Sequence, residues 1–126
     1  MKTQVLAAVL AAASLVAAGP AHAQYPERPI SLIVPFPPGG TADNMARALQ
    51  PALQRALKQT VLVVNKAGAG GAIGVSQVAN APADGYTVLL SLLSVASLPE
   101  QAVVNKQKPP FTLDQLTPVA LLSAEP

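Results

Sequence analysis

Two glycine-rich segments hold the residue types best suited to binding an anion. PFPPGGTAD at residues 35–43 and AGAGGAIG at residues 67–74 each stand between an apolar run and a helical pattern. A helix N-terminus carries unpaired N–H groups and a partial positive charge. Glycine lets a ligand approach the main chain because it has no Cβ. Two such termini facing one cleft would suit an anion with two ends, such as a dicarboxylate.

Several side chains near these segments could add polar contacts. Thr41 can donate through its hydroxyl, and the Asp43 carboxylate could accept a hydrogen bond from an amine. Ser91 and Ser94 follow a third apolar run and could reach a ligand from that side. In the alternative interpretation the glycines only form turns, Asp43 only favours the helix dipole, and the serines are ordinary loop residues. The glycines that would admit a ligand are Gly39, Gly40, Gly68, Gly70 and Gly71.

Other kinds of site are disfavoured by residue type and spacing. Gly68 and Gly70 do not begin a G-x-G-x-x-G motif, because Gly74 falls one residue late, and there is no G-x-x-x-x-G-K-[ST]. Beyond His22 the chain has no His, Cys or Trp, which removes thiolate and imidazole metal sites and Ser-His-Asp triads. An enzyme would have to use Asp, Glu, Lys, Tyr or Ser alone.

The first 23 residues have the layout of a secretory signal peptide. Lys2 precedes an apolar run of 14 residues from Val5 to Ala18, and Ala21-His22-Ala23 follows, so we expect cleavage after Ala23. The run is shorter than the roughly 20 residues of a membrane-spanning helix. A buried helix or an uncleaved anchor is the alternative. The remaining chain, with a net charge near +1, predicts no nucleic-acid partner and no membrane insertion.

The apolar pattern predicts an α/β fold with a parallel sheet. Strands are expected at residues 30–34, 61–65 and 86–90, the second covered on both faces. Thr41 would cap a helix of about four turns, which Pro51 kinks or divides in two. A second helix should end near Ala81.

The rest of the chain gives weaker signals. Residues 82–85 read as a turn, and residues 91–98 have no clear pattern. Residues 106–110 read as an exposed loop, and Thr112 would cap a short helical turn over residues 112–116. Residues 117–122 form a fourth apolar segment.

The two glycine-rich segments should lie at the same edge of this sheet. Each leaves the carboxyl end of a strand and enters a helix, and ligands of open parallel sheets bind beyond those ends. Asp84-Gly85-Tyr86 precedes the third strand, which places this turn at the opposite edge. The spacing therefore favours binding over a plain connector, although either segment alone would not.

Three stretches carry a resemblance to a known family. YPERPISLIVPFPPGGTAD, VVNKAGAGGAIGVSQVANAPADGYTVLLS and FTLDQLTPVALLSAEP resemble the substrate-binding proteins of tripartite tricarboxylate transporters, the Bug-type receptors. The resemblance implies a periplasmic receptor with two α/β lobes of the Venus-flytrap kind, which passes small carboxylates to membrane permease subunits. It implies no catalysis, cofactor or metal.

The resemblance also implies which residues bind. In the family, main-chain N–H groups and ordered waters of the two glycine-rich loops hold a ligand carboxylate. The matching positions are Phe36, Gly39, Gly40, Thr41 and Asp43 in the first loop and Ala69, Gly70, Gly71 and Ala72 in the second. Ser91 and Ser94 lie in a more variable stretch.

Family members are longer than this chain, so it reads as an N-terminal fragment. Residues 24–116 would form the first half of one lobe, and residues 117–126 would begin the crossover to a second lobe that is largely missing. Two other hypotheses remain open at this point. The chain could be a non-functional remnant, or an exported hydrolase that uses Asp43.

Overall fold

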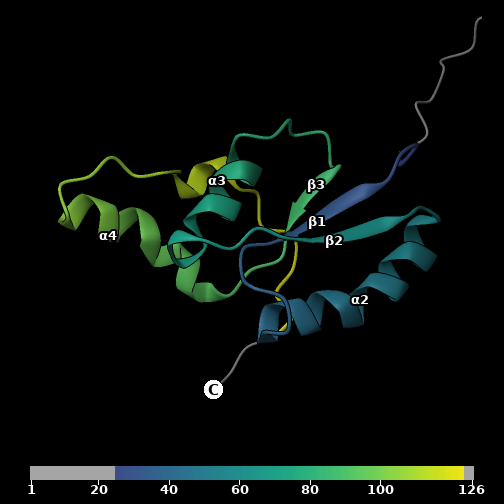
Figure 1. Cartoon of the computed structure of the whole chain (residues 1–126). Coiled ribbons are helices and arrows are strands. Elements are labelled where there is room, and N and C mark those ends of the chain that lie inside the picture. Colours follow the sequence, from purple (N-terminus) through teal and green to yellow (C-terminus); the bar gives the residue numbers. More distant parts are fainter. Residues whose placement is uncertain (1–24, 124–126) are drawn as a thin grey trace, which may run out of the picture.

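The computed structural model describes residues 25–123, which form an open three-stranded parallel sheet with helices on both faces (Figure 1). The strands are β1 (Ile30–Val34), β2 (Val61–Asn65) and β3 (Thr87–Leu89), in the order β2-β1-β3. The helices are α2 (Thr41–Leu57), α3 (Ala72–Ala79) and α4 (Leu98–Val104). The predicted α/β fold with a parallel sheet is confirmed. The predicted signal peptide lies outside the described residues.

Short 3-10 turns complete the chain and include the predicted turn near Thr112. They are η1 (Ala69–Gly71), η2 (Leu93–Ser97) and η3 (Leu113–Gln115). Thr112 caps η3 in a capping box with Gln115, as expected. The apolar residues of 117–122 form no regular element, and Val119 and Leu121 are exposed.

Successive side chains of β1 point to opposite faces of the sheet, which divides the core into two layers. Ile30, Leu32 and Val34 face α2, where they pack with Ala42 and Ala46. On the other face, Val75 of α3, Val95 and Phe111 form a second buried cluster. Each fully buried side chain of this size contributes about 1.5–3 kcal/mol. Two layers around one central strand therefore hold the carboxyl end of β1 rigidly.

Three local expectations differ from the structure. Thr41 is not the N-cap of α2, because Gly40 already has the extended cap conformation and its carbonyl accepts the Asn44 N–H at 2.9 Å. The helix runs unbroken through Pro51, which lies on its exposed side, so the two-helix alternative is wrong. β2 is an edge strand and is not covered on both faces, since Leu62 is 47% exposed.

No helix within residues 25–123 is long and apolar enough to cross a bilayer. Within the same range, no three potential metal-ligating side chains from His, Cys, Asp and Glu come together.

Candidate functional site

The sheet register places the two glycine-rich loops at the same level. Val34, the last residue of β1, pairs with Asn65, the last residue of β2, and the Lys66 N–H donates to the Val34 carbonyl at 2.8 Å. In Figure 1 both strands lead to the same end of the sheet, toward the beginnings of α2 and α3. The convergence expected from the sequence is therefore present.

The first loop presents its glycines to open space. Gly39 has a φ of +84°, and a Cβ built there would meet no atom within 4 Å. Gly40 and Thr41 are also exposed, at the start of α2, where the first N–H groups of a helix lack partners within the helix. Phe36 differs from them, because its half-buried side chain packs against both core clusters. It supports the loop from behind.

Asp43 is buried and fully engaged beneath the first loop. One carboxylate oxygen, Oδ2, accepts the Gly39 N–H at 2.8 Å and the Arg47 Nε–H at 2.9 Å, while Oδ1 accepts from Asn65 Nδ2 at 3.0 Å. The Arg47 hydrogen bond, then those of Gly39 and Asn65, lower the pKa of Asp43 from 3.8 to about 2. The carboxylate is thus ionised at neutral pH and holds Gly39 in place.

The second loop turns through a series of left-handed backbone conformations. Ala69, Gly70 and Gly71 have φ values of +47°, +65° and +105°. The Gly71 N–H donates back to the Gly68 carbonyl at 2.9 Å, which closes the turn η1 before α3 begins at Ala72. L-residues with side chains rarely adopt such angles, so glycine at 70 and 71 is required by the backbone as well as suited to a ligand.

The two loops touch each other through Pro35. A Cβ built on Gly71 would lie 3.5 Å from the Pro35 carbonyl oxygen, and one on Gly74 would lie 2.8 Å from Pro35 Cβ and 2.7 Å from the Lys66 carbonyl oxygen. Gly74 thus permits α3 to pack closely on the backbone of both loops. Nothing in the local sequence pattern indicates this role for Gly74.

The third connection approaches the second loop through an apolar residue. Val95 in η2 is buried, and its Cγ1 would be 3.2 Å from a Cβ on Gly71. Ser91 is half-buried and its hydroxyl contacts the Leu92 carbonyl at 3.4 Å, whereas Ser94 is exposed. These serines thus belong to the connection that lies against the second loop.

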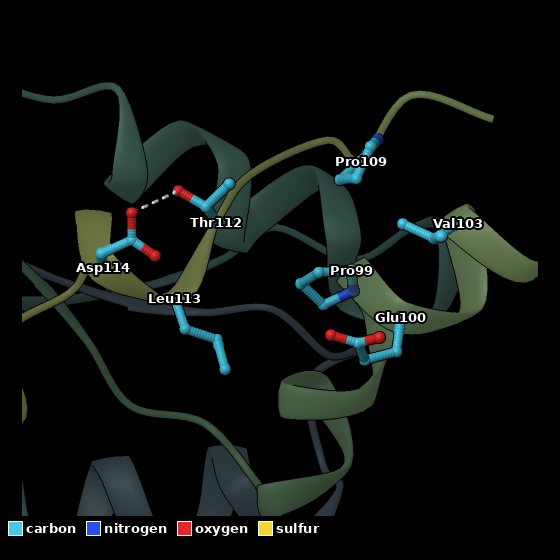
Figure 2. A pocket seen from close by; sticks show the side chains of 7 residues that line it. All are labelled: Pro99, Glu100, Val103, Pro109, Thr112, Leu113 and Asp114. Atoms are coloured by element: carbon cyan, nitrogen blue, oxygen red, sulfur yellow. Dashed lines mark hydrogen bonds between the residues drawn. The ribbon is translucent and has the colours of Figure 1, made fainter.

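Two cavities in the described structure lie beside α4. One, of about 310 Å³, is lined by Ala69 and Ala72 of the second loop and by polar residues that include Gln101 and Lys108. Figure 2 shows the other, of about 270 Å³, between the start of α4 and the segment that carries Thr112. Neither of these two cavities is lined by first-loop residues.

The Asp84-Gly85-Tyr86 turn lies at the opposite edge, as expected. The Tyr86 N–H donates to Asp84 Oδ1 at 3.0 Å, and Gly85 has a φ of +80°. Arg28 forms an ion pair with Asp84 at 2.8 Å and stacks over the Tyr86 ring at 4.2 Å. These contacts fasten the start of the described chain to β3 and lie apart from the glycine-rich loops.

Sequence reasoning did not identify two polar residues that organise the site. Asn65 donates through Nδ2 to the Phe36 carbonyl at 3.1 Å as well as to Asp43, and Arg47 pairs with Asp43. Their only signal is position: Asn65 ends a strand that precedes a glycine-rich loop, and Arg47 stands four residues after Asp43 on one helix.

Comparison with known proteins decides the family. Residues 45–126 match the family described as the tripartite tricarboxylate transporter family receptor. The chain belongs to this receptor family. BugT from Bordetella pertussis is 49% identical over 102 residues, which cover 81% of this chain and 31% of BugT. The chain therefore spans about a third of the length of the first curated relatives it matches.

Solved structures agree with the fold. The periplasmic binding protein BugD is 54% identical to the aligned part, an R. palustris protein solved with adipate is 42% identical, and MatC from Rhodopseudomonas palustris, solved with malate, is 35% identical. Each alignment covers 52% of this chain and 22% of the solved chain, with a TM-score of 0.50. The family is one of solute receptors rather than enzymes.

Proposed function

We propose that this protein contributes one side of a periplasmic binding site for a small organic carboxylate, in the class of adipate and malate. The observation that carries the proposal is the arrangement of the two glycine-rich loops, which leave neighbouring strands at the same level and each enter a helix. The N–H groups at the starts of α2 and α3 carry a partial positive charge, which attracts a carboxylate even where no charged side chain faces it. Two relatives were solved with such acids.

The candidate residues divide into two roles under this proposal. Those that would meet the ligand, directly or through water, are Gly39, Gly40, Thr41, Ala69, Gly70, Gly71 and Ala72, with Ser91 and Ser94 at the third connection. Phe36 and Asp43 would act from behind, because Phe36 packs on the core and both Asp43 oxygens already accept hydrogen bonds. The site would need neither metal nor catalysis.

The remaining parts of the proposal concern the whole receptor. Residues 1–23 would direct export and be removed after Ala23, and the receptor would deliver its ligand to the permease subunits of a tripartite tricarboxylate transporter. Residues 24–116 would supply the first half of one lobe of a two-lobed receptor. Residues 117–126 would lead toward the other lobe, consistent with the greater length of the relatives.

Calorimetric titration of the protein with malate and with adipate tests this function. We expect saturable binding of at least one acid, and at least a tenfold loss of affinity in Gly70→Val, whose side chain would stand in the second loop. Lys58→Val is the matched control, because Lys58 is exposed and also has a left-handed φ, of +51°, but it lies at the end of α2 away from both loops. Unchanged affinity in Gly70→Val, or equal losses in both variants, would refute the site.

A further inference from the structure

The Asn65 side chain links the end of β2 to the first loop and to the carboxylate beneath it. Its Nδ2 donates to the Phe36 carbonyl at 3.1 Å and to Asp43 Oδ1 at 3.0 Å, and its Oδ1 accepts from the Arg47 guanidinium at 3.3 Å. These partners come from the first loop and from α2. One carboxamide therefore joins the end of β2, the first loop and α2.

We propose that Asn65 is a positioning residue. It fixes the position of the first loop relative to the second, so that both loops present N–H groups to one carboxylate. This inference rests on the proposed function. The link continues through Asp43, whose Oδ2 holds the Gly39 N–H at 2.8 Å. Asn65, Asp43 and Gly39 thus form a hydrogen-bonded relay that begins two residues before the second loop segment and ends inside the first.

The chemistry of the relay requires a carboxamide. Two donor hydrogens and one acceptor oxygen on a short side chain match the three partners of Asn65. A carboxylate at this position has no hydrogen to donate and would stand beside the buried Asp43 carboxylate. Removing the amide would leave Asp43 Oδ1 without its partner in a place that water does not reach.

Protonation offers a way to separate positioning from general stability. An aspartic acid at position 65 is ionised at pH 7 and repels Asp43, whereas its protonated form regains a hydrogen to donate. The charged groups that face position 65 are Asp43 and Arg47, both from α2. Lys66, the next residue along the chain, is exposed. Asn65 is one of the hydrogen-bond donors that lower the pKa of Asp43 to about 2, so the variant loses that donor and its two neighbouring carboxyls take up one shared proton as the pH falls.

The experiment compares wild type, Asn65→Asp and Asn80→Asp at pH 7 and pH 4.5. Asn80 is an exposed residue at the end of α3 away from the second loop, and its amide donates to the Ser76 carbonyl at 2.7 Å, so it adds the same new charge to the chain without touching the relay. The first readout is the hydrogen-exchange protection factor of the Gly39 amide without ligand. The second is the affinity for malate and adipate, relative to wild type at the same pH.

We expect Asn65→Asp to lower Gly39 protection and affinity at pH 7 by at least tenfold each, and to regain part of both losses at pH 4.5, because one proton restores only one of the two donated hydrogen bonds. Asn80→Asp should stay within threefold at both pH values. Unchanged Gly39 protection in Asn65→Asp at pH 7 would overturn the relay. Lost protection with unchanged affinity would overturn positioning, and so would equal effects in the two variants.

Two further outcomes are distinguishable. If wild type binds neither acid, the proposed function is wrong. The relay is then tested by the hydrogen-exchange protection of Gly39 alone. If Asn65→Asp does not fold at pH 7, Asn65→Ser decides, since its single hydroxyl hydrogen can serve only one of the two acceptors. A partial loss of both readouts in Asn65→Ser supports the proposal, and wild-type values overturn it.

Discussion

A methyl group at Gly74 should force the two loops apart. The Cβ of Gly74→Ala would lie 2.7 Å from the Lys66 carbonyl oxygen, 2.8 Å from Pro35 Cβ and 2.9 Å from Pro35 Cα. Two of these three atoms are main-chain atoms, and the third belongs to a rigid proline ring, so no side-chain rotation relieves the contact. Ordinary contact begins at 3.4 Å, and α3 would have to move by about 0.7 Å.

The expected cost follows from two opposing effects. Overpacking of a close contact typically costs about 1–3 kcal/mol, whereas alanine in a helix interior is favoured over glycine by about 1 kcal/mol. We therefore expect Gly74→Ala to lower the free energy of unfolding by about 0–2 kcal/mol. Helix propensity alone predicts the opposite sign, which makes the result informative.

Urea denaturation followed by circular dichroism measures this change. Gly40→Ser is the matched control, because a Cβ at Gly40 would be 3.6 Å from its nearest neighbour and serine is favoured at a helix N-cap. The control should stay within about 0.5 kcal/mol of wild type or become slightly more stable. A Gly74→Ala protein more stable than wild type by about 1 kcal/mol, as helix propensity alone predicts, would refute the close packing of α3 on Pro35.

Three further predictions concern the rest of the molecule. Asp43→Asn should reduce the loss of folding stability between pH 4 and pH 2. The folded-state pKa of Asp43, about 2, lies below the usual 3.8, so the stability that the ionised carboxylate contributes is lost as the pH falls through that interval. The same dependence of the urea midpoint on pH in both proteins would contradict this. Asp84→Ala should cost about 1 kcal/mol in urea denaturation, since it removes the Arg28 ion pair and the Tyr86 N–H acceptor, and no change would show that this turn is held otherwise. Leu62→Lys should reduce concentration-dependent association measured by light scattering, because it places a charge on the open edge strand; unchanged scattering would place any association elsewhere.

The elements that sequence predicted well are those with strong local signals. The apolar runs at residues 30–34 and 61–65 became strands with those bounds, and the glycines at 39, 70 and 71 lie where left-handed backbone is required. The family resemblance, given by the same segments, was confirmed by the match over residues 45–126. Local pattern was sufficient because strand pairing and turn chemistry agree here.

The parts that sequence did not predict depend on distant contacts. α4 begins in a stretch with no clear period. Leu98 at its start packs against the second core cluster, and the next residue, Pro99, is buried. Asn65 looks like an ordinary loop residue, because its partners Phe36 and Asp43 stand 29 and 22 positions earlier. Nothing in the local pattern indicates that these groups meet.

Mapping a carboxylate onto the backbone tests the central claim most directly. Amide ¹H–¹⁵N shifts of the protein would be followed while malate or adipate is added. The two-loop site predicts saturable shifts at the amides of residues 39–41 and 69–72, with the Gly85 amide unmoved. Shifts confined to residues around Gln101 and Asn105 beside α4, or no saturable shift with either acid, would contradict it.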